Sequence, residues 1–466
     1  MGKKDYSDYT KMNLIFVLIG ERDAQYFYNL ALFLKKYFAN ISFISFNDSA
    51  KRIIKQERNV KLINLSYKNE DYSHQYSLIE TNYKISLDDV IRHDLVTFKS
   101  SKKFLKNKFI HYFLTLDSIL DSQKNNYVFQ EIGGYIANLS VFYQCKNKNI
   151  NHVFLEPSFF PGRVHALINS IDPVNPKLIK PVSVCVKKHL ETCQEMKLLS
   201  FSSKDKLHYS HPIKKFFLIG NWTALLTKLL NIYVKKNYVE HQFWKSHIKR
   251  YAGYAFNSTY SFIFNFYKEL NQVDQDKAIY FPLHVPEDFQ LTTRCPEFYD
   301  QIKILRTLLS IKPKNVALIT KEHPAMKGSF PSRQTKDLFQ RKDFYLIQPE
   351  INNFDIIKFS ELIITINSKT GFEALLSNKK VICLSKSFYS NSGLTINLSL
   401  AELSKSINGI IPTEEIDQSE KVLHLAQGIY NLSYPMSLYD NSELNILNSV
   451  ETVIQIMKNE NFIPNQ

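Results

Sequence analysis

The chain has 466 residues and a mass of 54.5 kDa, about three times the most common domain size, so we expect two or three domains. Hydrophobic residues make up 44% and charged residues 22%, which excludes a wholly disordered or collagen-like chain. The formal net charge of +15 favours polyanionic partners: nucleic acid, an anionic membrane face or phosphorylated ligands.

The first part of the chain has the pattern of a parallel α/β layer. Apolar residues recur at helical spacing across residues 23–38, and this predicted helix lies between two predicted strands. The predicted strands are residues 12–19, 41–46 and 149–155. The last of them runs into Glu156-Pro157 and a turn. We therefore expect an N-terminal Rossmann-like domain over residues 1–178.

Residues 179–272 have a helical pattern and are predicted to form a connector or insertion. Their basic, amphipathic stretch 214–236 is interrupted by Asn221 and Lys228, which are costly in hydrocarbon, so it does not predict a membrane span. Two interpretations stay open: a helix packed on the protein core, which we favour, and peripheral contact with an anionic inner-membrane face.

The five cysteines are far apart and form no CxxC pair, so the sequence predicts neither a disulfide framework nor a structural zinc site. A reducing cytosol fits this pattern best. We expect a cytoplasmic protein, with peripheral association on the inner membrane as the open alternative.

Residues 273–466 predict a second Rossmann-like domain. A first strand at 277–282 is followed by four strands that each end in a polar loop, at 315–320, 343–347, 362–366 and 380–384. In open parallel sheets ligands bind beyond the carboxyl ends of the strands, so we expect these loops to converge on one crevice. The predicted fold class is α/β, with two Rossmann-like domains facing across a cleft and a helical connector.

The turn from Ser368 to Gly371 predicts an anion-binding site. A strand stops there and a helix is expected to start near Gly371, so backbone N–H groups and the Ser368 and Thr370 hydroxyls face outward. Glu373 would lie in the first turn of the helix, where it either bonds a ribose diol or complements the helix dipole. Serine and threonine at a helix start are very often only caps, so phosphate binding and capping are both open.

Two further loops carry candidate catalytic groups. Pro324 fixes the turn after its strand so that His323 projects toward the same crevice, where it could donate to a phosphate or act as an acid. Asp288 lies in a loop stiffened by two prolines and could be a nucleophile or base at a sugar carbon. Glu156 would face it from the first domain. Taken singly, each is more often a surface or solvated residue.

These segments, taken in order, resemble the bacterial capsule polysaccharide biosynthesis and export family, which includes β-Kdo transferases. The resemblance rests on ordered motifs across residues 125–176 and 278–396. The motifs are Phe154-Leu-Glu-Pro-Ser-Phe-Phe-Pro161, Asp172-Pro-Val-Asn175, Tyr280-Phe-Pro-Leu-His-Val-Pro-Glu-Asp-Phe-Gln290, Lys321-Glu-His-Pro-Ala325, Gln348-Pro349, Asn367-Ser-Lys-Thr-Gly-Phe-Glu-Ala-Leu375, Tyr389 and Gly393-Leu-Thr395.

The resemblance implies a GT-B-like fold, with the first domain on the acceptor side, and sugar transfer from a nucleotide donor such as CMP-Kdo. It implies that His323 and the turn from Ser368 to Gly371 hold the donor phosphate, while Gln348 and Glu373 contact the nucleoside. Asp288 would be the carboxylate nearest the anomeric carbon. Lys369 replaces a residue that is often small in the family, and it would either add a phosphate contact or fill the site.

The function that we expect is a metal-independent glycosyltransferase of cell-surface polysaccharide assembly, with no cofactor beyond its nucleotide-sugar donor. Its expected partners are a lipid-linked or oligosaccharide acceptor, the inner-membrane surface and the capsule export machinery. The basic residues form no dense run, so we do not expect nucleic acid binding. The alternatives are a non-catalytic capsule export or carbohydrate-binding module and a nucleotide-sugar epimerase of similar fold.

Overall fold

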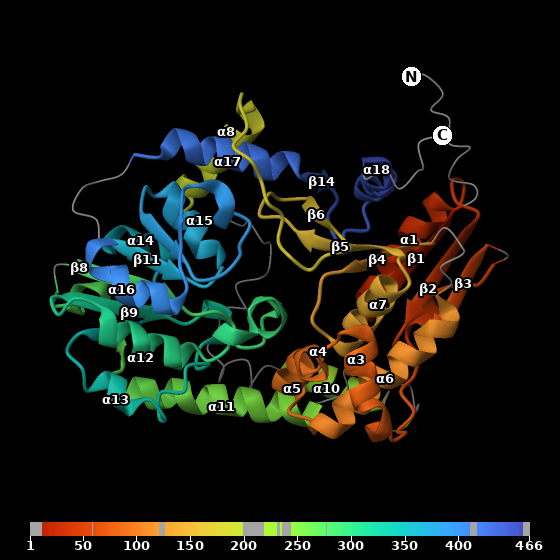
Figure 1. The fold of residues 1–466 in the computed structure, drawn as a ribbon, viewed down its shortest axis with the longest axis horizontal. Coiled ribbons are helices and arrows are strands. Elements are labelled where there is room, and N and C mark those ends of the chain that lie inside the picture. Colours follow the sequence, from red (N-terminus) through yellow and green to blue (C-terminus); the bar gives the residue numbers. More distant parts are fainter. Residues whose placement is uncertain are drawn as a thin grey trace. The chain divides into compact units, whose positions relative to one another are not determined.

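The computed structural model divides the chain into two compact units, each built on one α/β sheet (Figure 1). The first unit comprises residues 1–172, 224–243 and 433–466, and the second comprises residues 173–223 and 244–432. The structure describes residues 12–57, 59–120, 126–198, 219–230, 234, 244–275, 277–410 and 417–459.

The first sheet has seven strands among the described residues, in the order β14-β6-β5-β4-β1-β2-β3. The first five strands, β1 to β5, are parallel to one another. Beyond β5, the strand β6 pairs antiparallel with β5, and β14 pairs antiparallel with β6. The strand bounds are β1 Asn13–Leu18, β2 Asn40–Ser45, β3 Val60–Asn64, β4 Asn126–Glu131, β5 Asn151–Pro157, β6 Arg163–Ile168 and β14 Ser433–Pro435. This confirms the predicted parallel layer.

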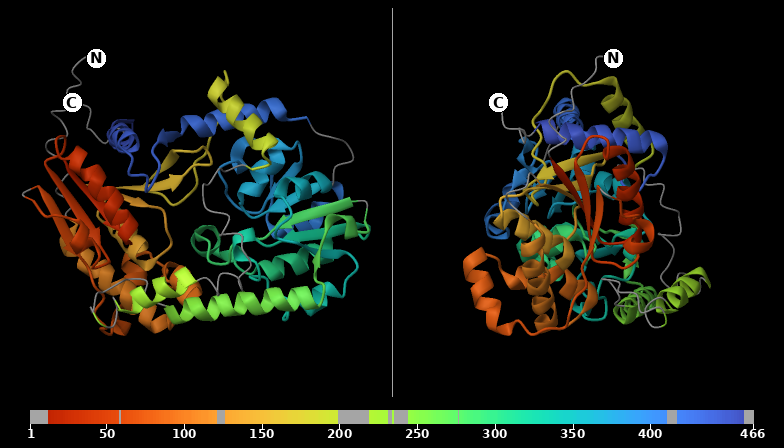
Figure 2. Two further views of the ribbon diagram at one scale, coloured as in Figure 1. Left: turned by 180° about the vertical axis from the view of Figure 1, so that it is seen from behind. Right: turned by 90° about the vertical axis from the view of Figure 1, so that its right-hand side faces the viewer.

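Helices cover both faces of this sheet (Figure 2). Their bounds are α1 Glu21–Leu34, α2 Ala50–Ile53, α3 Tyr76–Tyr83, α4 Leu87–Val90, α5 Arg92–Phe98, α6 Lys102–Ile119, α7 Ile136–Asn147 and α18 Glu443–Asn459. Because side chains alternate along a strand, Leu14 and Phe16 of β1 pack toward α1 and α18, while Ile15 and Val17 pack toward α6 and α7. Burial on both faces explains why the strand reads as one continuous apolar run.

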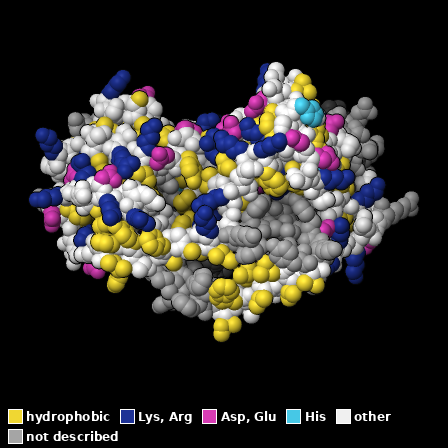
Figure 3. All heavy atoms as spheres, turned by 90° about the horizontal axis from the view of Figure 1, so that it is seen from below, with side chains coloured by type: hydrophobic (Ala, Val, Ile, Leu, Met, Phe, Trp, Pro, Cys, Tyr) yellow, Lys and Arg dark blue, Asp and Glu magenta, His cyan; other side chains and the backbone are white. Residues whose placement is uncertain are grey.

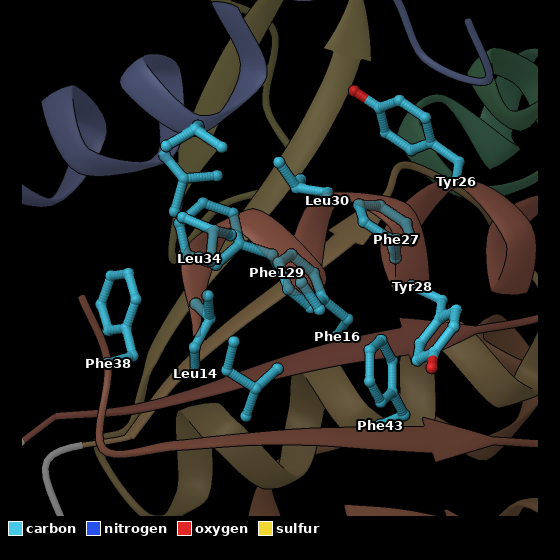
Figure 4. Packing of buried hydrophobic residues seen from close by; sticks show 14 of the residues in the cluster. Leu14, Phe16, Tyr26, Phe27, Tyr28, Leu30, Leu34, Phe38, Phe43 and Phe129 are labelled. Atoms are coloured by element: carbon cyan, nitrogen blue, oxygen red, sulfur yellow. The ribbon is translucent and has the colours of Figure 1, made fainter. Parts of the chain in front are cut away.

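Aromatic rings fill the core beneath α1 (Figure 4). The ring of Phe16 on β1 stacks on Phe27 of α1 at a centroid distance of 4.8 Å and on Phe43 of β2 at 5.9 Å. Phe129 of β4 lies 6.2 Å from Phe16. Each such ring buries a large apolar area, so this cluster ties three neighbouring strands to the helix above them.

The C-terminal end of the chain returns to the first unit, although we expected one domain over 273–466. The strand β14 pairs with β6, and α18 packs along α1, where the Tyr26 and Ser449 hydroxyls are 2.8 Å apart. Burial of the apolar face of α18 against β1 and α1 provides the physical reason.

The second sheet also has seven strands among the described residues, all parallel, in the order β13-β12-β11-β8-β9-β10-β7. Their bounds are β7 Tyr267–Lys268, β8 Lys277–Pro282, β9 Val316–Lys321, β10 Phe344–Ile347, β11 Leu362–Thr365, β12 Lys380–Cys383 and β13 Ile396–Asn397. All five strands predicted after residue 272 are present, each within one residue of its expected bounds. Two parallel-dominated sheets confirm the predicted α/β fold class, whereas the arrangement of the units across a cleft stays a prediction.

The helices of the second unit include two that lie in the expected connector, α8 and α11. Their bounds are α8 Val184–Glu195, α11 Trp244–Ile263, α12 Gln301–Ile311, α13 Lys336–Phe339, α14 Asn353–Phe359, α15 Lys369–Leu376, α16 Leu400–Ile410 and α17 Ser419–Asn431. A further helix, α10, spans Ile219–Leu229. The rest of the predicted basic stretch, residues 214–218 and most of 231–236, lies outside the described residues. In the part of the chain that the structure describes, no helix is long and apolar enough to cross a bilayer.

Candidate active site

The strand order of the second sheet reverses between β8 and β11. From β8 the chain runs to β9 and β10 on one side, and β11, β12 and β13 then follow on the other side. In open α/β sheets such a reversal opens a crevice beyond the carboxyl ends of the strands. The strands β9 and β11 both border β8, so their ends lie about 10 Å apart, which is two strand spacings. The loops that carry His323 and Ser368 therefore lie at the same edge of the sheet.

Asp288 lies in the loop that follows β8 and is held by its own backbone and side chain. Its N–H donates to the Val285 carbonyl at 2.9 Å, and its carbonyl accepts from the N–H groups of Leu291 and Thr292. Its Oδ1 accepts from the Gln290 N–H at 2.9 Å. The side chain is half-buried, so this carboxylate has a fixed position at the start of the turn.

His284 lies in the same loop and is a site residue that our sequence analysis did not nominate. The Gln301 side chain accepts from the His284 N–H at 2.8 Å and donates to its carbonyl, which fixes the backbone. The imidazole is only 7% exposed, and its Nε2 is buried without a hydrogen-bond partner. Burial lowers the pKa of His284, the nearby Asp288 charge opposes this shift, and His323 adds to it. His284 is thus near both predicted catalytic groups, and burial favours its neutral form.

His323 is exposed and stands two residues beyond the end of β9. Its carbonyl accepts from the Met326 N–H at 2.8 Å in the short turn that starts at Pro324, as the proline predicted. The preceding Glu322 is fully buried and accepts from the Tyr267 hydroxyl at 2.6 Å and from the Gly328 N–H at 3.1 Å. A buried, bonded carboxylate therefore fixes the loop that presents His323.

The helix α15 begins at Lys369, two residues earlier than expected, and Ser368 is its N-cap. The Ser368 hydroxyl accepts from the Thr370 N–H at 3.0 Å, and the Ser368 N–H donates to Thr365 Oγ1 at 3.1 Å. The capping interpretation is therefore confirmed, while phosphate binding at this turn stays a prediction. Lys369 is exposed at the start of the helix.

Gly371 is buried inside α15 because another side chain occupies the space beside it. A Cβ atom at this position would lie 2.1 Å from the Tyr389 hydroxyl oxygen, and that hydroxyl donates to the Ser368 carbonyl. Glycine is therefore needed for the close approach of Tyr389, whose hydrogen bond to Ser368 stabilises the turn.

Glu373 belongs to the second turn of α15, so its expected place in the first turn is wrong by the two residues by which the helix starts early. Asn353 at the start of α14 donates to both Glu373 and Thr370, the latter at 3.0 Å, and accepts from Tyr280 at 2.7 Å. Burial raises the pKa of Glu373, and the Asn353 hydrogen bond and the Lys321 charge oppose this shift. A polar network thus joins β8, α14 and α15 beneath the crevice.

The other two predicted site residues belong to other elements, β10 and β5. Gln348 is half-buried just after β10, and its N–H donates to the Lys268 carbonyl at 3.0 Å. Glu156 lies in the first unit, within β5 and opposite His165 of β6, whereas we expected it just after its strand. Its opposition to Asp288, like the nucleoside contact of Gln348, stays a prediction.

The helix α11 fastens the loops that follow β8 and β9. Arg250 forms an ion pair with Glu287, which is adjacent to Asp288, at 3.2 Å, and both side chains are almost buried. The Tyr254 hydroxyl donates to the same carboxylate at 3.0 Å. One turn later the Asn257 amide donates to the Gly328 carbonyl at 3.1 Å. At Gly328, a Cβ atom would lie 2.0 Å from the Tyr254 carbonyl oxygen.

A pocket of about 290 Å³ opens beside the crevice, at the end of β12. It is lined by Cys383, Leu384, Ser385, Lys386, Ser390, Asn391, Asn397, Leu398 and Ser399. The Ser385 hydroxyl accepts from Cys295 Sγ at 2.9 Å, and Asn367 Nδ2 donates to the same sulfur at 3.2 Å. The Asn367 Oδ1 atom is buried without a partner. Polar groups thus continue from the Asp288 loop toward this pocket.

The second sheet therefore brings a carboxylate, two imidazoles and a capped helix N-terminus to one edge. Such an edge can stabilise negative charge through N–H groups and the helix dipole, and positive charge through Asp288. Sequence patterns nominated Asp288, His323 and the Ser368 turn, but they gave no signal for His284, whose unpartnered nitrogen is visible only in three dimensions.

Comparisons with known proteins give matches of partial length. Residues 197–428 match the family model described as "Capsule polysaccharide biosynthesis protein". The capsule polysaccharide modification protein LipA of Neisseria meningitidis serogroup B is 33% identical over 123 residues, which is 26% of this chain and 17% of LipA. Protein FixF of Sinorhizobium fredii is 28% identical over 145 residues, 30% of this chain and 34% of FixF. The matches thus span between a sixth and a third of these relatives.

Solved structures are similar at low sequence identity. The β-Kdo 2,7 transferase KpsC of Thermosulfurimonas dismutans matches with a TM-score of 0.34 and 18% identity, covering 80% of this chain and 97% of that chain. The UDP-GlcNAc 2-epimerase of Neisseria meningitidis matches with a TM-score of 0.29 and 12% identity, covering 96% and 100%.

Proposed function

Because the chain belongs to the capsule polysaccharide biosynthesis family, we propose that it is a glycosyltransferase that builds a capsular or related cell-surface polysaccharide. Its donor is a nucleotide sugar, with CMP-Kdo as the specific candidate, and its acceptor is a lipid-linked or oligosaccharide glycan. It works without a metal at the cytoplasmic side of the inner membrane, next to the capsule export machinery.

One observation carries the proposal. The charges of Asp288 and His323 both act on the buried His284, and the loops after β8 and β9 meet where the strand order reverses, which supports a site made of one carboxylate and two imidazoles. Transfer of a sugar requires groups of both kinds, because the phosphate leaves as an anion while the sugar carbon becomes cationic.

The roles follow from the chemistry of each group. The donor phosphate lies against His323 and the N-terminus of α15, where a proton donor and the helix dipole offset its charge as the bond to the sugar breaks. Asp288 faces the anomeric carbon and either stabilises the cationic sugar or captures it covalently. His284 hydrogen-bonds the bound donor through Nε2, which completes the pairing of a buried polar atom.

Replacement of Asp288 by Asn tests this assignment. The Asn side chain keeps an oxygen for the Gln290 N–H, so the loop remains folded, but the negative charge is lost. We expect transfer to fall by at least about 10²- to 10³-fold, with the nucleotide dissociation constant unchanged. Release of nucleotide from CMP-Kdo and other nucleotide sugars, with and without a lipid-linked acceptor, measures this.

Each other result of that assay has a definite meaning. Nucleotide release only in the presence of acceptor supports transfer. Interconversion of the donor sugar without acceptor would replace the proposal with an epimerase, and glycan binding without turnover would replace it with a binding module. Full activity of the Asp288→Asn variant would remove Asp288 from the mechanism. A thermal-shift screen of CMP, UDP and GDP selects the nucleotide, because a ligand that binds only the folded state raises its melting temperature.

A further inference from the structure

The helix α11 has two faces of opposite character. Its inner row, made of Arg250, Tyr254, Asn257 and Ser261, contacts the loops after β8 and β9. At 100° per residue, Phe256 and Ile263 lie on the opposite side of the helix, and both are exposed. Phe262 at the C-terminal end is 80% exposed. Such side chains in water are costly unless another surface covers them.

Figure 3 looks at the side of the molecule on which α11 lies in Figure 1, and hydrophobic side chains gather on that side. Phe264, the first residue after α11, is also exposed, and the Lys336 ammonium lies 6.0 Å from the centre of its ring. Aromatic side chains flanked by lysines are typical of surfaces that lie in the interface between water and lipid.

The helix α10 exposes an apolar stripe of its own. Ile219, Trp222, Leu226 and Leu230 recur at spacings of three and four residues, and each is exposed, Ile219 to 79%. We favoured packing of this stretch on the protein core. The four side chains of the stripe are not covered by the core, so another surface can contact them, whereas packing of the rest of this stretch stays a prediction.

The charge around these helices identifies the partner. In sequence, residues 214–268 contain nine lysines and arginines, one of which, Arg250, is paired with Glu287, but only one acidic residue, Glu240. They also contain both tryptophans of the chain. A protein partner would be matched by charges of both signs, whereas an anionic bilayer attracts a segment that is almost purely basic. Each basic residue near such a surface strengthens binding by about fivefold, and tryptophan prefers the headgroup region.

We propose that the outer face of α11 docks the second unit on an anionic lipid bilayer, and that the exposed stripe of α10 is a separate contact with the same kind of surface. The apolar side chains enter the headgroup boundary, and the basic surplus of this part of the sequence attracts the anionic headgroups. The inner row of the same helix holds the loops that carry Asp288 and His323. The proposal does not depend on the reaction at that site, because it rests on exposed residues outside the crevice.

Co-sedimentation of the full chain with vesicles tests the docking surface. Vesicles of phosphatidylcholine alone are compared with vesicles that also contain phosphatidylglycerol. We expect binding only to the anionic vesicles, weakened by salt because ions screen exposed charges. The Phe262→Ser/Ile263→Ser variant and the Leu226→Ser/Leu230→Ser variant each bind at least about tenfold more weakly, since each loses two apolar anchors. All four positions are exposed, so the fold is retained.

The matched control is Leu444→Ser on α18, an equally apolar residue that is 72% exposed in the first unit. It binds vesicles as the wild type does. The proposal is overturned if the wild type binds neither vesicle, if the control weakens binding as much as the paired variants, or if light scattering shows a dimer that Phe262→Ser dissociates. Transfer to a soluble acceptor stays unchanged in all these variants, so failure of docking is distinct from failure of the proposed reaction.

Discussion

The two sheets share one strand order but carry different chemistry at their carboxyl ends. The order β10-β9-β8-β11-β12 repeats the order β3-β2-β1-β4-β5, so the same reversal point occurs twice. At the second sheet, the adjoining loops present Asp288 and His323, and His284 keeps an unpartnered nitrogen. At the first sheet, the Asp23 carboxylate accepts from the N–H groups of Ile19 and Gly20 at 2.8 and 3.1 Å.

This difference separates what topology decides from what side chains decide. Topology places a crevice at the edge of each sheet. Whether that crevice can bind an anion depends on its hydrogen-bonding groups. At the first sheet the N–H groups of Ile19 and Gly20 are already bonded to Asp23, whereas at the second sheet His284 Nε2 is left for a ligand. We therefore expect nucleotide affinity to respond to changes at the second edge and stability alone to respond at the first.

The largest expected effect on stability comes from the ion pair that holds the second edge. In the Arg250→Met variant, the Tyr254 hydroxyl is the one hydrogen-bond partner that the almost buried Glu287 carboxylate keeps among the described residues. We expect the free energy of unfolding to fall by about 3 kcal/mol, because one buried charge is left without its counter-charge. Urea denaturation measures the change.

A matched exposed pair provides the control. Arg306→Met breaks an ion pair with Asp337 whose side chains are both about half exposed, so the cost is below about 1 kcal/mol. Equal losses in the two variants would show that α11 does not secure the Asp288 loop.

A pH-dependent effect of similar size is expected at Lys321, which is buried and feels the charge of Glu373. Burial lowers the pKa of Lys321 to about 8 against a usual value of 10.5. Between these values the unfolded chain holds a proton that the folded chain has released, so stability rises with pH across this window. This difference in pKa corresponds to about 3 kcal/mol of stability gained across the window.

The Lys321→Met variant should lack this rise. Denaturation curves of both proteins between pH 8 and 10.5 isolate the contribution of Lys321, since other groups titrate equally in each. The exposed Lys303→Met serves as the control. If the free energies of unfolding of the wild type and of Lys321→Met change with pH in parallel across this range, burial does not lower the pKa of Lys321.

The smallest effect is expected at the first edge. Asp23→Ala removes the acceptor of two backbone N–H groups at the start of α1, which costs about 1 to 2 kcal/mol. The melting temperature should fall, and nucleotide affinity should stay at the wild-type value. A loss of nucleotide affinity would mean that the two edges are not chemically distinct.

Much of the fold could be predicted because the strands are buried on both faces. Continuous apolar runs such as 362–366 mark such strands without any tertiary information. The return of β14 and α18 to the first unit could not be predicted, because it depends on pairing across more than 250 residues, as in the bond from Arg163 Nε to Ser433 Oγ. The edge strand β7 has only two residues and leaves no pattern.

Site residues could be predicted where they lie in a turn that closely follows a strand. His323 and Ser368 stand two and three residues after the ends of their strands, so their place at one edge follows from the parallel order alone. Asn353, Tyr280 and Arg250 were missed because their partners lie in other elements. Glu373 was misplaced by half a turn because α15 starts at Lys369, two residues before the glycine that suggested its start.

Titration with the nucleotide selected by thermal shift tests the central claim, that the second edge binds the donor phosphate. The comparison uses wild type, His323→Asn and Asp23→Ala. We predict that His323→Asn weakens binding by at least about tenfold, the cost of a hydrogen bond to a charged group, while Asp23→Ala binds as the wild type does. Unchanged affinity in His323→Asn, or loss of affinity in Asp23→Ala alone, would contradict the account.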